Sequence, residues 1–162
     1  MSTEPLALAG WSFRISHIPM KKQTKTIYSF GHSSKPLATF LNKLADYKIE
    51  VVVDVRTFPT SRYLPYFNKN ALHSELAKRA IKYLWKGKNL GGRGVNVRYE
   101  ETIDELSEMA KNGTRVCVMC SEGEYKKCHR YLVLTPSFEE RGLSVTHIEY
   151  ENDTRKRTHK RK

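Results

Sequence analysis

The chain has 162 residues, 39% of them hydrophobic, and a mean hydropathy of −0.61. These values predict one soluble domain with a core of its own, and no apolar run reaches the roughly 20 residues that a membrane-spanning helix needs. The net charge of +12 favours an anionic partner over a neutral one.

The chain contains three cysteines, and this odd number indicates a reducing compartment without a disulfide framework. Residues 1–19 lack the basic start and long apolar core of a secretory signal, so we expect a cytoplasmic protein. A bridge between Cys120 and Cys128 remains an alternative.

Residues 1–24 are interpreted as an N-terminal extension. The segment is either disordered and upstream of a true start at Met20, or a short element that packs on the sheet through Trp11, Phe13 and Ile15.

Residues 25–151 are expected to form the folded domain, followed by a basic tail over 152–162. The tail is predicted to be disordered because no apolar residue anchors it. It either binds nucleic acid through counterion release or remains a solvated tail. Its six positive charges come from Arg155, Lys156, Arg157, Lys160, Arg161 and Lys162.

Strand and helix patterns alternate through the first half of the domain. Residues 26–30 are predicted to be a strand, and Pro36 opens a helix because its fixed φ suits the first turn. The apolar residues between 37 and 47 follow helical spacing. Residues 49–55 form a β-branched run, typical of a strand buried on both faces. An irregular loop over 56–68, a helix over 70–80 and a short strand over 81–85 follow.

The second half continues the alternation after a glycine-rich loop over 86–96. A helix is expected from about Tyr99 to Asn112, then a strand over 115–120. A helical segment over 128–142 contains Pro136, which should divide it into a turn to about Leu134 and a piece from Ser137. The last strand covers 143–150.

This alternation with short loops predicts an α/β fold. We expect a single three-layer domain with a mainly parallel sheet of about five strands and helices on both faces.

Reactive side chains follow four of the predicted strands. The carboxyl edge of an open α/β sheet is where ligands bind, because helix N-termini and free amides gather there. The candidates are His32 and Ser33 after the first strand, Asp54 and Arg56 after the second, Gly91 and Gly92 after the third, and Cys120, Glu122, Cys128, His129 and Arg130 around the end of the fourth.

Three of these residues are candidates for proton transfer. Asp54 follows three valines, so we expect it to be partly desolvated and paired with a cation such as Arg56. It is either a general base or half of a structural ion pair. Glu122 is the second candidate, and His32 either assists, binds an anion with Ser33, or is structural.

Cys120 is the candidate nucleophile, because Arg130 and the helix amides would favour its thiolate. The spacing excludes the simplest phosphatase pattern, since Lys126 rather than an arginine stands six residues after Cys120. Cys117 is interpreted as a core residue.

Arginines are the candidates for anion binding, because a guanidinium makes bidentate contacts to phosphate or carboxylate. Arg56 and Arg130 flank predicted strand ends. Arg62 lies in a loop with Tyr63, Tyr66 and Phe67, which either stacks on bases or folds over the core as a cap.

Position at the same edge adds Gly91, Gly92, Cys128 and His129 to the anion-binding set, although His129 could instead face solvent. Residues 91–94 lack the P-loop lysine and the dinucleotide glycine pattern. The spacing of the cysteines and histidines matches no common zinc site, so we expect neither a metal nor a cofactor.

A set of short motifs stands in fixed order along residues 26–150 and resembles the DUF488 family. The motifs are Gly31-His32-Ser33; Asp54-Val55-Arg56 with Pro59, Ser61 and Arg62; Phe67-Asn68; Leu90-Gly91-Gly92; and Cys120 and Glu122 with Cys128-His129-Arg130. The resemblance implies a compact α/β domain with these residues at one site. It implies no reaction.

Three hypotheses follow. The first is a pocket for a nucleotide or nucleic acid, with the arginines binding the anion. The second is a non-catalytic nucleic-acid-binding module that uses Arg62, its aromatic neighbours and the basic tail. The third is a thiol-dependent sulfur or redox enzyme. None involves a membrane, and the oligomeric state is not predicted.

Overall fold

Five parallel strands form one sheet in the order β3-β2-β4-β1-β5 in the computed structural model, which describes residues 25–151. The predicted α/β class and parallel sheet are confirmed. The N-terminal extension and the basic tail lie outside the described residues. The strands are β1 (Thr26–Gly31), β2 (Val51–Asp54), β3 (Lys82–Trp85), β4 (Val116–Cys120) and β5 (Ser144–Ile148).

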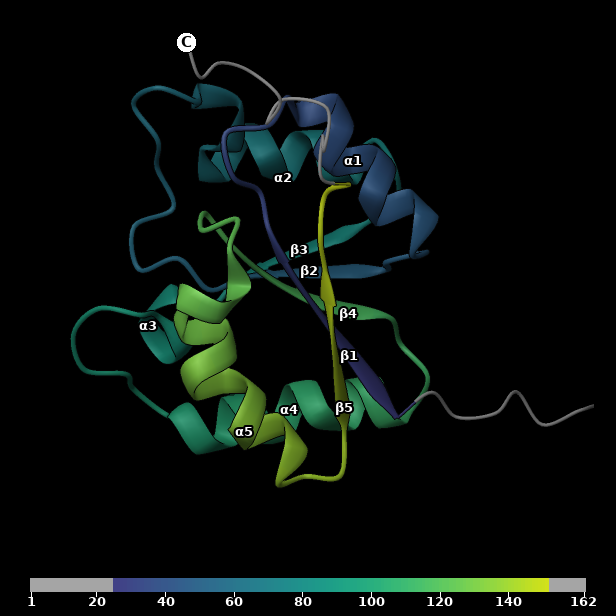
Figure 1. Ribbon diagram of the computed structural model, residues 1–162, viewed down its shortest axis with the longest axis vertical. Coiled ribbons are helices and arrows are strands. Elements are labelled where there is room, and N and C mark those ends of the chain that lie inside the picture. Colours follow the sequence, from purple (N-terminus) through teal and green to yellow (C-terminus); the bar gives the residue numbers. More distant parts are fainter. Residues whose placement is uncertain (1–24, 152–162) are drawn as a thin grey trace, which may run out of the picture.

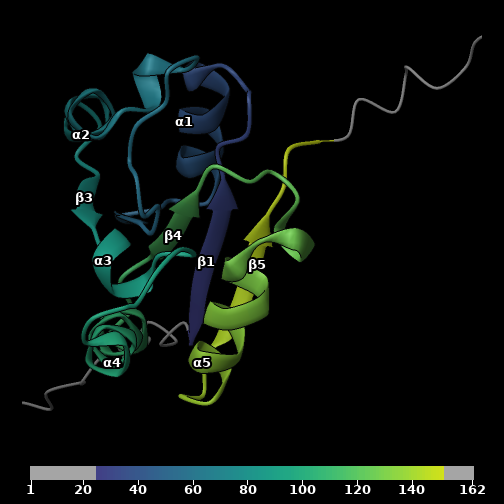
Figure 2. The ribbon, with the colours of Figure 1, turned by 90° about the vertical axis from the view of Figure 1, so that its left-hand side faces the viewer.

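The helices pack against both faces of the sheet, as predicted (Figures 1 and 2). They are α1 (Leu37–Asp46), α2 (Lys69–Ala77), α3 (Gly87–Leu90), α4 (Tyr99–Lys111) and α5 (Thr135–Glu139), with shorter turns η1 (Pro65–Phe67) and η2 (Tyr125–Lys127) and a π-type helix η3 (Arg130–Leu134).

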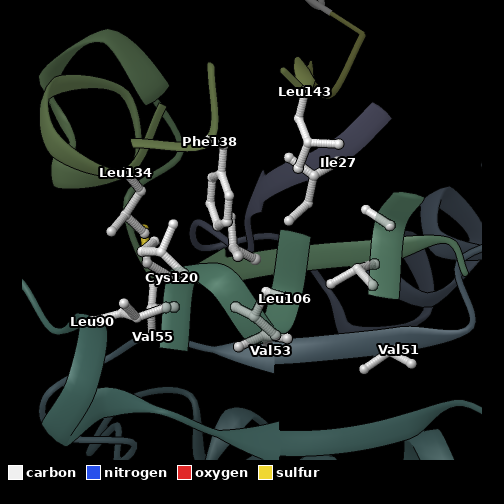
Figure 3. Packing of buried hydrophobic residues seen from close by; sticks show 14 of the residues in the cluster. Ile27, Val51, Val53, Val55, Leu90, Leu106, Cys120, Leu134, Phe138 and Leu143 are labelled. Carbon is white, nitrogen blue, oxygen red and sulfur yellow. The ribbon is translucent and has the colours of Figure 1, made fainter. Parts of the chain in front are cut away.

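Each face of the sheet has its own hydrophobic core, because successive side chains of a strand point to opposite faces. Val52 of β2 packs with Phe40 of α1 and Leu72 of α2. Its neighbour Val53 packs on the other face with Leu106 of α4 (Figure 3). Both faces of β2 are therefore covered, which explains its uninterrupted apolar sequence.

The order of the strands places three carboxyl ends side by side. The chain moves from β1 to β2 and β3, then reverses, so that β4 enters between β2 and β1. In the register of the sheet, Cys120 pairs with Gly31 and Met119 pairs with Asp54. Backbone bonds continue past the strand ends, from His32 N–H to the Cys120 carbonyl at 2.9 Å. The switch in chain direction therefore brings three strand ends together at the edge where ligands bind in sheets of this kind.

Two local predictions need correction. The glycine-rich segment 86–96 is not all loop, because α3 occupies Gly87–Leu90. The last helical segment is divided at Leu134, as predicted, but its second piece begins at Thr135 rather than at Ser137. Pro136 therefore stands in the first turn of α5, where its missing N–H costs little.

No helix within residues 25–151 is long and apolar enough to cross a membrane.

Candidate functional site

A cavity of about 580 Å³ opens at the carboxyl ends of β1, β2 and β4. Four separate parts of the chain form it, and most of the predicted site residues lie in or next to its wall. The lining residues are His32, Arg56, Thr57, Phe58, Thr60, Ser61, Gly92, Arg93, Cys120, Ser121, Glu122, Lys127, Cys128 and His129.

Asp54 is fully buried and bound to Arg56, as the sequence predicts. Arg56 Nε and Nη2 donate to the two carboxylate oxygens at 2.9 and 2.6 Å, and the Tyr83 hydroxyl donates to the same carboxylate. Arg56 Nη2 also donates to the Phe67 carbonyl at 2.8 Å. The carboxylate does not line the cavity, so Asp54 holds Arg56 in place rather than meeting a ligand.

His32 stands beside Arg56 at the end of β1. Its Nδ1 lies 2.6 Å from the Ser33 carbonyl, so Nδ1 carries the hydrogen and Nε2 is an acceptor, 3.5 Å from Arg56 Nη1. The ring stacks on Phe67 with centroids 4.0 Å apart. Burial, followed by the charge of Arg56, lowers the pKa of His32 to about 4 although the Ser33 bond opposes this shift. His32 is therefore neutral at neutral pH.

Arg130 lies behind the cavity wall rather than in it. It is 1% exposed, and each guanidinium nitrogen has an acceptor. Nε donates to Cys120 Sγ at 2.9 Å, Nη1 to Ser29 Oγ at 2.6 Å, and Nη2 to the Glu122 carbonyl at 2.8 Å. These bonds use three of its five N–H groups and hold the guanidinium outside the cavity lining.

The Sγ atoms of Cys120 and Cys128 lie 3.0 Å apart as free thiols. His129 adjoins this pair: its Nε2 lies 3.1 Å from the Leu90 carbonyl and its Nδ1 lies 3.5 Å from Cys128 Sγ. The carbonyl can only accept, so Nε2 carries the hydrogen and Nδ1 faces the sulfur. His129 is half-buried in the wall of the cavity, so it does not simply face solvent.

The proton of the thiol pair belongs on Cys120. The hydrogen bond from the Cys120 thiol lowers the pKa of Cys128, whereas burial opposes this shift. The same shared proton and burial raise the pKa of Cys120. Both cysteines are buried in the same core cluster, with Cys120 4% and Cys128 5% exposed, and Figure 3 shows Cys120 near Val55 and Leu134. The order of donors is therefore Arg130 N–H to Cys120 S–H to the Cys128 thiolate.

Two glycines are required by close contacts at this site. A Cβ on Gly31 would stand 1.7 Å from the Glu122 carbonyl oxygen, the acceptor of Arg130. A Cβ on Gly92 would stand 2.9 Å from His129 Nδ1. Real Cβ contacts essentially never fall below 3.0 Å, so both positions exclude a side chain unless a neighbour moves.

Four other predicted residues are not at the centre of the cavity. Ser33 and Gly91 are outside its lining, and so is the exposed Arg62. Glu122 is in the lining but exposed, and its carboxylate accepts the Glu124 N–H at 2.9 Å. Cys117 is fully buried on the opposite face, as predicted for a core residue.

Sequence reasoning left several lining residues out of the site, among them Thr57, Phe58, Thr60, Ser121 and Lys127. A signal was available for them, because each lies close in sequence to a predicted site residue: three of them to Arg56, Ser121 to Cys120 and Lys127 to Cys128. Within residues 25–151, no group of three or more His, Cys, Asp or Glu side chains is arranged to hold a metal ion.

The family model described as "Domain of unknown function DUF488" matches residues 36–100. This segment of the chain is similar to the DUF488 family. The DUF488 match includes Asp54, Arg56 and Gly92, and it confirms the resemblance that the motifs gave. His32 and the Cys120–Arg130 region lie outside the matched DUF488 segment. No curated protein and no solved structure matches the chain.

Proposed function

We propose that the protein is a thiol-dependent enzyme that acts on an anionic substrate, with the Cys128 thiolate as nucleophile. The observation that carries the proposal is the position of Cys128 Sγ, 3.0 Å from Cys120 Sγ and 3.5 Å from His129 Nδ1, in the wall of the cavity. A thiolate that receives hydrogen bonds is the reactive form of cysteine.

The rim of the cavity supports an anionic substrate. Arg56, Arg93 and Lys127 line it, against a single carboxylate, that of Glu122. Arg56 keeps Nη1 toward the cavity side, near His32, while Asp54 and Phe67 occupy its other nitrogens. Cations gathered at the mouth of a cavity attract and orient an anion.

The reaction that suits a close thiol pair is disulfide exchange. The Cys128 thiolate attacks one sulfur of a substrate disulfide, the substrate S–S bond breaks, and one half leaves as a thiolate. Cys120 then gives its proton to His129 Nδ1 and attacks Cys128 Sγ. A Cys120–Cys128 disulfide forms and the second half leaves. The protein loses two electrons, the substrate gains them, and an external dithiol restores the pair in a reducing cytoplasm.

Oxidised glutathione, an anionic disulfide, tests this chemistry in a single turnover. We expect the unmodified chain to release two glutathione molecules and to gain a Cys120–Cys128 disulfide. Cys120→Ser should release one glutathione molecule and retain the other as a mixed disulfide on Cys128. Cys128→Ser should release no glutathione. Cys117→Ala is the matched control because Cys117 is buried on the other face. Release of glutathione by Cys128→Ser at the unmodified rate would refute the assignment.

The exposed loop after β2 favours a second candidate, single-stranded nucleic-acid binding. Tyr63 is 87% exposed next to the exposed Arg62, so this part of the loop is not a cap over the core. An exposed ring beside a cation suits base stacking with backbone contact. Oligonucleotide affinity measured against salt should fall in Tyr63→Ala and in a chain without residues 155–162. Equal affinity in all three chains removes this candidate.

A further inference from the structure

A second cavity of about 420 Å³ adjoins the thiol pocket. The two share Thr57, Phe58 and Arg93 in their walls, so a ligand can extend from one into the other. The remaining walls of the second cavity are Gly87, Lys88, Gly94, Val95 and Val97. None of the residues that carry the proposed thiol chemistry belongs to this second set.

Three apolar side chains in the wall of this cavity face solvent. Phe58 is 66% exposed, Val95 93% and Val97 59%. Exposed apolar side chains gathered in a concave surface mark a place where a ligand is bound. A flat aromatic group would cover the Phe58 ring and the two valines together.

Hydrogen bonds hold the segment that carries these valines in a fixed shape. The Val97 N–H donates to the Lys88 carbonyl at 3.0 Å, and Asn89 Nδ2 donates to the Val97 carbonyl at 2.8 Å. The Arg93 N–H donates to Thr57 Oγ1 at 3.2 Å and joins the two walls. The cavity is thus formed before a ligand arrives, which lowers the entropy cost of binding.

The charge of this cavity favours an anionic ligand. Lys88 and Arg93 are in the lining, and no carboxylate is. Its volume suits one ring system rather than a macromolecular surface.

We infer that the thiol pocket and this cavity form one elongated site for a small aromatic anion, whose ring lies over Phe58, Val95 and Val97 and whose reactive sulfur lies beside Cys128. The inference deepens the proposed function and rests on it for the position of the reactive group. The substrate class is an aromatic disulfide that carries a carboxylate, sulfonate or phosphate.

Naphthalene-2-sulfonate tests the cavity without any thiol chemistry. Calorimetry should show binding to the unmodified chain, and Phe58→Ala should weaken it about tenfold, because the ring loses its apolar contact. Tyr63→Ala is the matched control, since Tyr63 is an exposed ring of the same loop outside both cavities. Neutral 2-naphthol and aliphatic methanesulfonate should each bind more weakly than the probe.

The position of the reactive group is tested with 5,5′-dithiobis(2-nitrobenzoate), an aromatic dianion, against oxidised glutathione. Val95→Ala, which changes a residue of the second cavity alone, should slow the first reaction and leave the second unchanged. Absent probe binding, or binding that Phe58→Ala leaves unchanged, overturns the inference even where glutathione reacts. Failure of the glutathione reaction with normal probe binding overturns the thiol chemistry alone. Dimerisation that Phe58→Ala abolishes would assign this surface to a second copy of the chain and overturn the inference.

Discussion

The Nε atom of Arg130 donates a hydrogen bond to the Sγ atom of Cys120 at 2.9 Å. Arg130 fills the acceptor side of the Cys120 sulfur, so the Cys120 proton points to Cys128 Sγ, 3.0 Å away. The arginine expected to bind a substrate instead orients the thiol that activates Cys128 in the proposed reaction. Its buried charge acts through two sulfur atoms rather than by contact with an anion.

The first prediction concerns the pH dependence of Cys128. Because the pKa of Cys128 lies below that of an ordinary thiol, iodoacetamide should alkylate it at nearly the same rate at about pH 6 as at about pH 8. An ordinary thiol, with a pKa of about 8.5, slows roughly tenfold per pH unit over that range. Peptide mass spectrometry identifies the labelled residue.

Loss of the hydrogen bond to Cys128 should restore the pH dependence of an ordinary thiol. Cys120→Ala removes the S–H donor, so it should raise the pKa of Cys128 and slow its alkylation at low pH. Cys117→Ala keeps this donor and should keep the flat profile. A profile in Cys120→Ala identical to that of the unmodified chain would mean that the thiol pair is not coupled.

The second prediction concerns the Asp54–Arg56 pair. Asp54→Asn leaves the guanidinium of Arg56 buried without its counter-charge, and such a loss costs about 3–5 kcal/mol of unfolding free energy. Urea unfolding measures the loss. The matched control is Glu75→Gln, which breaks exposed contacts with Lys78 and Arg79 and should change the midpoint little. Equal effects of the two substitutions would contradict a structural role for Asp54.

The backbone of this domain follows closely from local sequence signals. The β-branched run that ends at Asp54 predicts a buried strand, and Gly113 predicts the end of α4, where its φ is +91°. Such signals act over a few residues, and tertiary contacts do not override them here. The short helix α3 was missed because glycines at 91, 92 and 94 suggest loop over the whole segment, although only the part after Leu90 is irregular.

The site is harder to predict because its details depend on which hydrogen-bond donors and acceptors the fold brings together. Sequence places Arg56 and Arg130 equally at the ends of strands. Only the strand order, with β4 between β1 and β2, puts Ser29 and Cys120 around Arg130 and leaves Arg56 at the cavity. The assignment of the thiolate to Cys128 rather than to Cys120 likewise depends on the direction of one S–H bond, which sequence spacing does not predict.

The third prediction concerns acid stability. The pKa of His32 is lowered from 6.5 to about 4, mainly by burial, so the unfolded chain binds a proton in this range that the folded chain does not. Stability is therefore unaffected above pH 6.5 and falls as the pH drops towards about 4, by up to roughly 3 kcal/mol at 1.36 kcal/mol per unit.

His32→Gln should flatten this part of the stability curve. The substitution loses the stack on Phe67, so its unfolding free energy should be lower at neutral pH. The diagnostic quantity is the slope between pH 4 and pH 6.5, from urea titrations at several pH values. Parallel curves for the two chains would show that His32 is not the group that titrates.

The fourth prediction contrasts two glycines of the site. In Gly31→Ala the new Cβ meets a backbone carbonyl that cannot move without breaking its hydrogen bond from Arg130. We therefore expect a loss of several kcal/mol of unfolding free energy, or failure to fold.

In Gly92→Ala the new Cβ meets only the imidazole of His129, which can rotate away. Folding should then be nearly normal, but Nδ1 of His129 loses its position beside the thiol pair. Gly92→Ala should therefore show a thermal midpoint close to that of the unmodified chain together with slower release of the second glutathione molecule, the step in which Nδ1 accepts the Cys120 proton. Normal release of the second glutathione by a folded Gly92→Ala chain would remove His129 from the proposed reaction. A stable Gly31→Ala chain would show that the carbonyl contact is not rigid.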